Sequence, residues 1–102
     1  MQKLDIIVKT LEDKLADDIN VIKLEDSSVA DYFVVATGNS VNQTRALADY
    51  IEEALAKEGY DVLSNEGLRE GEWILMDAGD IIIHIFTPRQ REFYGIDDLW
   101  EE

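Results

Sequence analysis

The stretch over residues 71–84 constrains the fold most, because it predicts two strands joined by a tight turn. It reads Gly-Glu-Trp-Ile-Leu-Met-Asp-Ala-Gly-Asp-Ile-Ile-Ile-His. Residues 73–76 and 81–86 are runs of strand-forming side chains, and the residues between them include the Asp and Gly that favour hairpin turns. We therefore expect an antiparallel hairpin at the centre of the fold.

Pairing across the turn predicts which side chains of the hairpin share a face. Whether two or four residues form the loop, we expect Met76 to pair with Ile81 and Trp73 to pair with His84. One face is then aliphatic and suits the core; it carries Ile74, Met76, Ile81, Ile83 and Ile85. The other, mixed face carries Trp73, Leu75, Asp77, Asp80, Ile82, His84 and Phe86. This mixed face is too aromatic and too polar to be simple core.

Length and composition fit one compact domain over residues 1–102. The chain has 102 residues, of which 46% are hydrophobic, and this suffices for a single core. It has no cysteine, so we expect neither disulfides nor a thiolate metal site. No apolar run reaches membrane-spanning length and the first residues lack the apolar core of a signal peptide, so we expect a cytoplasmic protein without membrane contact.

The charge of the chain is strongly acidic. Nine Lys and Arg residues stand against 23 Asp and Glu residues, which gives a net charge of −14. Such a charge repels phosphate backbones, so we expect little direct contact with nucleic acid and a better fit to a basic protein. A simpler interpretation is that the charge only keeps the domain soluble, so charge alone names no partner.

Periodicity and capping signals divide the rest of the chain into helices and strands. The predicted elements are an amphipathic helix over 3–16 whose apolar stripe includes Leu15, a strand over 19–24, a buried strand over 32–36, a helix from Ser40 to about residue 58 closed by Gly59, a strand ending at Leu63, a polar loop over 64–71, a helix from Thr87 to near Gly95 and an apolar tail over 96–100. Ser40 with Gln43, and Thr87 with Gln90, have the spacing of capping boxes. The segment 32–63 resembles a strand–helix–strand crossover with parallel strands. The fold class is therefore α/β, with a mixed sheet flanked by helices.

Two short stretches could bind small ligands. Gly38-Asn39-Ser40 precedes a helix and could present N–H groups to a phosphate, but the stretch lacks the glycines and the lysine of a phosphate-binding loop, so helix capping is favoured. Asp77 and Asp80 could hold a divalent ion, but Asp is common beside turns and no further ligand is placed near them, so turn formation is favoured. We expect no metal and no cofactor.

The mixed face of the hairpin admits two interpretations. His84 is the only histidine, and no serine with an orienting acid stands at triad spacing, so a structural or contact role is favoured over catalysis. Trp73 beside Leu75 and polar groups has the composition of a binding hot spot. Alternatively, the C-terminal segment folds over this face and buries it with its own apolar residues, which are Phe93, Tyr94, Leu99 and Trp100.

The residues also resemble a known family, the ribosomal silencing factor RsfS or Iojap-like proteins. The resemblance covers nearly the whole chain. Its motifs are residues 31–40, Gln43, Ala48-Asp49, Glu66-Gly67, residues 71–80, His84, Phe86, Arg91, Tyr94 and Leu99-Trp100. Several separated motifs in the same order make the resemblance specific.

The resemblance implies a non-enzymatic factor with a fold similar to the nucleotidyltransferase core but without its paired carboxylates. Such a factor binds large-subunit ribosomal protein fourteen on the large ribosomal subunit, blocks joining of the small subunit and represses translation under nutrient limitation. The contact residues implied are Trp73, Leu75, Asp77, His84, Arg91 and Tyr94, supported by Asp80, Leu99 and Trp100. Alternatives are an assembly factor for the large subunit and a metal-dependent nucleotidyltransferase that uses residues 38–40 with Asp77 and Asp80. The free protein could also form a homodimer through the Trp73 face.

Overall fold

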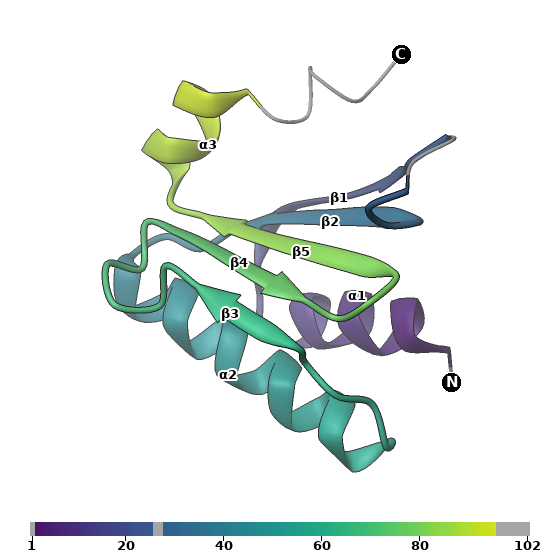
Figure 1. Cartoon of the computed structure of the whole chain (residues 1–102). Coiled ribbons are helices and arrows are strands. Elements are labelled where there is room, and N and C mark those ends of the chain that lie inside the picture. The colour runs from purple at the N-terminus through teal and green to yellow at the C-terminus, as the bar shows by residue number, and fades with distance from the viewer. Residues whose placement is uncertain (1, 26–27, 96–102) are drawn as a thin grey trace.

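A mixed sheet lies between two long helices on one face and one short helix on the other (Figure 1). The computed structural model describes residues 2–25 and 28–95. In these residues five strands form one sheet in the order β1-β2-β5-β4-β3. The elements are α1 (Lys3–Asp13), β1 (Asp17–Lys23), β2 (Tyr32–Thr37), α2 (Val41–Lys57), β3 (Ser64–Glu66), β4 (Trp73–Asp77), β5 (Ile81–Phe86) and α3 (Pro88–Tyr94). The predicted single α/β domain with a mixed sheet is confirmed.

The hairpin of β4 and β5 forms as predicted, but its register differs by two residues. Trp73 pairs with Phe86, and Leu75 pairs with His84. The reason is the turn: the Ala78 N–H donates to the Ile81 carbonyl at 2.9 Å, which leaves only Gly79 and Asp80 in the loop. Gly79 has a φ of +91°, which a two-residue hairpin loop requires. Because a shift of two preserves the orientation of every side chain, the two predicted faces are retained.

The core has two parts, one on each side of the sheet. The aliphatic face of the hairpin is fully buried beneath α1 and α2, in a cluster that includes Ile7, Leu11, Leu47, Ile51, Leu55, Ile74, Met76, Ile83 and Ile85. A smaller cluster occupies the other side, namely Ile22, Leu24, Ala30, Phe33, Val35, Ile82 and Phe86. Trp73 and Leu75 pack against this second cluster while remaining partly exposed. The mixed face is therefore core at its centre and surface at its margin.

The first helix is shorter than the predicted 3–16, because the chain reverses after Asp13. The Ala16 N–H donates to the Leu11 carbonyl at 2.9 Å, and the Leu15 N–H donates to the Glu12 carbonyl at 3.1 Å. These two bonds form a Schellman motif, in which Leu15 takes the left-handed position with a φ of +62°. Leu15 is consequently 77% exposed, and its predicted place in the apolar stripe is wrong.

The two strands of the predicted crossover are parallel, as predicted, but they are not neighbours, because β5 and β4 lie between them in the sheet. β2 pairs in parallel with β5, and the strand that follows α2 lies at the far edge of the sheet, antiparallel to β4. That strand begins at Ser64, inside the predicted loop, because Tyr60 and Val62 pack on the core without joining the sheet. A polar strand is tolerated at this place because an edge strand has one free side.

The last described helix begins and ends where the sequence predicts, but its capping bond is absent. Pro88 is the first residue of α3, and Gly95 closes the helix in a left-handed conformation. The Thr87 side chain makes no capping hydrogen bond, while its backbone N–H continues the sheet by donating to the Glu72 carbonyl at 2.9 Å. The predicted tail over 96–100 lies outside the described residues.

Candidate contact surface

An aromatic cluster lies where the start of β4 meets α3. The Trp73 ring lies 4.5 Å from the Tyr94 ring and 5.1 Å from the Phe86 ring, measured between centroids. Tyr94 is 45% exposed, and its neighbour Phe93, whose ring contacts it at 5.0 Å, is 77% exposed. We call Trp73, Leu75, Phe93 and Tyr94 the aromatic surface. The structure thus brings together two predicted contact residues, Trp73 and Tyr94, that are distant in sequence.

Phe93 was predicted only as part of a covering segment, and its exposure is a new observation. It lies on a helix of seven residues, which is too short for periodicity to separate its inner and outer faces. An aromatic side chain that remains exposed beside other aromatic rings favours a binding surface.

His84 lies beneath the aromatic surface. Its side chain is only 3% exposed, and its ring meets the Phe33 ring edge-on at 4.7 Å. The Trp73 indole Nε1–H donates a hydrogen bond to His84 Nδ1 at 3.1 Å, although the two residues are not direct partners across the strands. Desolvation in this apolar site lowers the pKa of His84 to about 4, so the imidazole is neutral at physiological pH. His84 was predicted as a contact residue, but its buried ring could affect a partner only through the residues that cover it.

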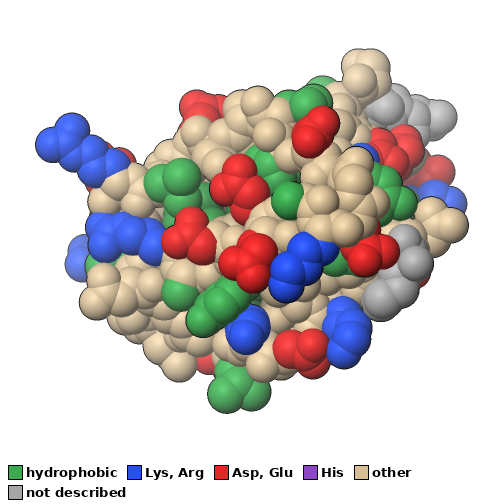
Figure 2. Space-filling view, turned by 90° about the horizontal axis from the view of Figure 1, so that it is seen from below, with side chains coloured by type: hydrophobic (Ala, Val, Ile, Leu, Met, Phe, Trp, Pro, Cys, Tyr) green, Lys and Arg blue, Asp and Glu red, His purple; other side chains and the backbone are tan. Residues whose placement is uncertain are grey.

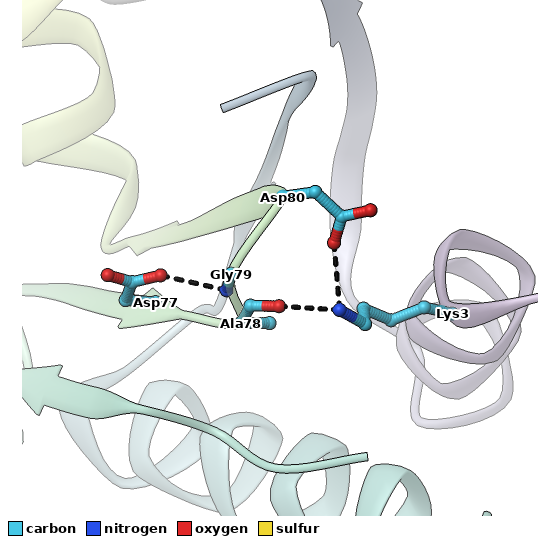
Figure 3. A network of polar contacts seen from close by, with 5 residues as sticks. All are labelled: Lys3, Asp77, Ala78, Gly79 and Asp80. Atoms are coloured by element: carbon cyan, nitrogen blue, oxygen red, sulfur yellow. Dashed lines mark hydrogen bonds and ion pairs between the residues drawn. The ribbon is translucent and has the colours of Figure 1, made fainter. Parts of the chain in front are cut away.

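The two aspartates of the turn are occupied by structural bonds (Figure 3). Asp77 accepts a hydrogen bond from the Gly79 N–H at 2.9 Å, and Asp80 accepts one from Lys3 Nζ at 2.8 Å. The bond from Lys3 lowers the pKa of Asp80 below its usual value. Within residues 2–25 and 28–95, no three His, Cys, Asp or Glu side chains gather to hold a metal ion. These contacts support the turn interpretation over the metal interpretation.

Arg91 connects α3 to β1 and β2 at the end of the sheet where β5 leads into α3. Its Nη1 donates to Thr37 Oγ1 at 2.9 Å and also to the Asp18 carbonyl oxygen. The arginine thus anchors the helix that carries Phe93 and Tyr94. The predicted contact role of Arg91 stays a prediction, and Leu99 and Trp100 lie outside the part of the chain that the structure describes.

The stretch Gly38-Asn39-Ser40 caps a helix. Ser40 Oγ accepts a hydrogen bond from the Gln43 N–H at 3.1 Å, and the Gln43 side chain accepts one from the Asn39 N–H at 2.6 Å. The capping groups are therefore engaged by the chain itself. A cleft of about 960 Å³ lies beside this cap, and its charged lining consists of Asp17, Asp18, Glu92 and Arg91. This lining is mainly acidic and disfavours a nucleotide phosphate.

The face of the molecule away from α3 carries charged side chains of both signs (Figure 2). Figure 2 shows the face covered by α1 and α2, where acidic and basic side chains are interspersed with small apolar areas. Ion pairs between Lys9 and Asp13 and between Glu53 and Lys57 lie along these helices. None of the described helices is long and apolar enough to cross a membrane. The aromatic surface on the α3 side is therefore the better candidate for a protein partner.

The fold and this surface define a class: a small α/β domain with a partly exposed aromatic patch. All 102 residues match the model of a family described as "Ribosomal silencing factor during starvation". The chain belongs to this family, whose members are non-enzymatic ribosome-binding factors that regulate translation. The alternative of a metal-dependent nucleotidyltransferase is thereby overturned.

Related proteins support this family assignment over most of the chain. The ribosomal silencing factor RsfS of Chromobacterium violaceum is 39% identical over 98 residues, which cover 93% of this chain and 79% of that protein. The protein of the same name from Bacillus subtilis is 38% identical over 98 residues, covering 95% and 83%. A crystal structure of a Chromobacterium violaceum protein is similar with a TM-score of 0.91 at 36% identity, covering 98% of this chain and 87% of that chain.

Proposed function

We propose that this chain binds large-subunit ribosomal protein fourteen on the large ribosomal subunit and blocks the joining of the small subunit by steric exclusion. Translation would fall when nutrients are scarce and the factor is bound. The family assignment supports the ribosome as the target. The protein then acts in the cytoplasm, where the subunits meet.

The observation that carries the proposal is the aromatic surface. Trp73 and Tyr94 are in ring contact but remain partly exposed, and Phe93 extends the same surface. Aromatic side chains that are fixed by neighbours and open to solvent are typical binding hot spots, because they bury a large area with little loss of side-chain freedom. Leu75 packs beside Trp73 and adds apolar area at the margin.

The acidic charge supports the same partner class. Asp and Glu total 23 against nine Lys and Arg, so the domain is attracted to a basic protein and repelled by exposed RNA phosphates. Long-range attraction would orient the approach, and the aromatic surface would supply the short-range affinity. Steric exclusion needs only that the bound domain occupies the docking area, so it requires no catalytic group.

The experiment is sedimentation of purified subunits through sucrose gradients with and without the protein. We expect the wild-type protein to travel with large subunits and to reduce the amount of joined ribosomes. Trp73→Ala should weaken binding by about 30-fold or more, as expected when a hot spot is truncated. Tyr50→Ala is the matched control, because Tyr50 is an exposed aromatic residue on α2, on the other side of the sheet. Wild-type affinity of folded Trp73→Ala would contradict the proposed surface.

A further inference from the structure

The hydrogen bond between Trp73 and His84 fixes the protonation pattern of the histidine. An indole N–H can only donate, so His84 Nδ1, 3.1 Å from Trp73 Nε1, must accept. The neutral imidazole then carries its proton on Nε2. Burial in the apolar site lowers the pKa of His84 to about 4 and maintains this acceptor at physiological pH.

The second nitrogen of the ring is unsatisfied. His84 Nε2 is buried and has no hydrogen-bond partner among the described residues. The ring lies between aromatic neighbours, edge-on to Phe33 and parallel to Phe86 at 6.1 Å. An aliphatic side chain could fill this apolar site without bringing an unpaired polar atom of its own, so the imidazole is unfavourable for packing alone. What it supplies and an aliphatic residue does not is the acceptor for the Trp73 indole.

The Trp73 indole makes two kinds of contact, which are ring contacts with Phe86 and Tyr94 and a hydrogen bond with His84. Its ring stacks with Phe86 at an interplanar angle of 27° and meets Tyr94 at 47°. Ring contacts of this kind still permit the indole to slide or flip, whereas a hydrogen bond at Nε1 distinguishes one edge of the ring from the other. The bond to His84 is thus the contact that selects a single orientation.

We propose that His84 is a positioning residue of the aromatic surface, which holds the Trp73 indole in its binding orientation before a partner arrives. This inference rests on the proposed function. His84 is itself only 3% exposed, so it acts through Trp73 and not by touching the partner. A side chain that is already fixed loses less freedom on binding, which strengthens the complex without a new contact.

The first test concerns the free protein and needs no ribosome. In a Trp100→Phe background, the indole N–H resonance of Trp73 is the only one left. Replacing His84 by Leu should shift this resonance and accelerate its exchange with solvent by about tenfold, because the acceptor is lost. His84→Asn, which offers an amide oxygen near the position of Nδ1, should preserve slow exchange. An unchanged resonance and exchange rate in folded His84→Leu would overturn the inference.

The second test is a double-mutant cycle on binding to purified large subunits. Trp73→Phe keeps an aromatic ring but removes the indole N–H. We expect His84→Leu to weaken binding about five- to tenfold when Trp73 is present, but hardly at all in the Trp73→Phe background. Equal losses in both backgrounds would show that His84 acts through the general fold and would overturn the inference alone. Failure of the wild-type protein to bind large subunits would instead overturn the proposed function.

Discussion

Lys3 and Asp80 are 77 positions apart in the chain, yet their side chains form an ion pair at 2.8 Å (Figure 3). The same ammonium group donates to the Ala78 carbonyl at 2.7 Å. The first helix is thereby attached to the tip of the β4–β5 hairpin. Because the Lys3 side chain is only 21% exposed, water screens this contact less than it screens the other ion pairs of α1 and α2.

Removing the charge of Lys3 should reduce stability measurably. We expect Lys3→Met to lower the free energy of unfolding by about 1 kcal/mol, because a partly buried carbonyl and a carboxylate both lose their donor. Urea unfolding measures the change. Lys9→Met is the control, since Lys9 pairs with Asp13 at 3.1 Å on the exposed surface of the same helix. We expect this control to change the free energy by less than about 0.5 kcal/mol. Equal effects would contradict the special role of Lys3.

The pKa of His84 predicts a pH dependence of stability. It is lowered to about 4 in the folded protein, from an ordinary value of 6.5. Between these values the unfolded chain binds a proton that the folded protein does not, so stability falls as the pH falls from 6.5 towards 4 and is retained above 6.5. Relative to His84→Asn, the wild-type protein should lose about 2 kcal/mol of unfolding free energy between about pH 7.5 and about pH 5.

Urea unfolding at several pH values makes this measurement. Comparison with the variant is essential, because the many carboxylates titrate in both proteins and their contributions cancel in the difference. A difference that does not depend on pH would contradict the lowered pKa.

Two glycines with the same backbone angle should respond differently to substitution. Gly59 and Gly67 both have a φ of +82°, but a Cβ on Gly59 meets nothing within 4 Å, whereas one on Gly67 would lie 2.0 Å from the Trp73 carbonyl oxygen. We expect Gly59→Ala to cost about 1 kcal/mol, from the left-handed backbone alone. Gly67→Ala should cost about 3 kcal/mol or more, because the start of β4 must move.

The same pair of variants tests the position of Trp73. Gly67→Ala should also weaken binding to large subunits, because the backbone that carries the indole is displaced, whereas Gly59→Ala should bind as the wild-type protein does. Thermal or urea unfolding and gradient sedimentation provide the two measurements. Similar behaviour of the two variants would show that β4 tolerates the clash.

The net charge of −14 predicts that salt acts mainly on the association rate. Raising the salt concentration from about 50 to about 300 mM should slow capture by large subunits while changing dissociation little, because long-range attraction is screened. Stopped-flow measurement with labelled protein gives both rates. Trp73→Ala should show the opposite pattern, with a faster dissociation and a similar association. An association rate independent of salt would contradict electrostatic steering.

The faces of the hairpin could be predicted because side chains alternate along a strand with a period of two. The register could not, because the sequence does not show which two residues form the loop, and the bond between the Ala78 N–H and the Ile81 carbonyl selects Gly79 and Asp80. The predicted end of the first helix is wrong because Leu15 hides the turn that ends it. A left-handed helix end is normally marked by glycine, and here a leucine occupies it.

The order of the strands and the burial of His84 required the structure. β2 pairs with β5, a contact between strands separated by α2, β3 and β4, and no local pattern encodes it. Trp73 could be predicted as a candidate contact residue because the reverse side of its strand already formed a core, but the sequence left open whether the C-terminal segment covers it. The sequence could not show that His84 lies under the indole, since alternation gives the face of a side chain but not the depth of the layer that covers it.

The strand order also has a consequence for how the chain folds during its own synthesis. β5 lies between β2 and β4, yet it is the last strand to leave the ribosomal exit tunnel among those described. Until it emerges, β2 lacks its parallel neighbour and β4 has only the short β3 beside it. The sheet is therefore completed only after the strands on both sides of β5 have already left the tunnel. The contact between Trp73 and Tyr94 needs both β4 and α3, so the proposed binding surface forms only after the rest of the described fold has been synthesised.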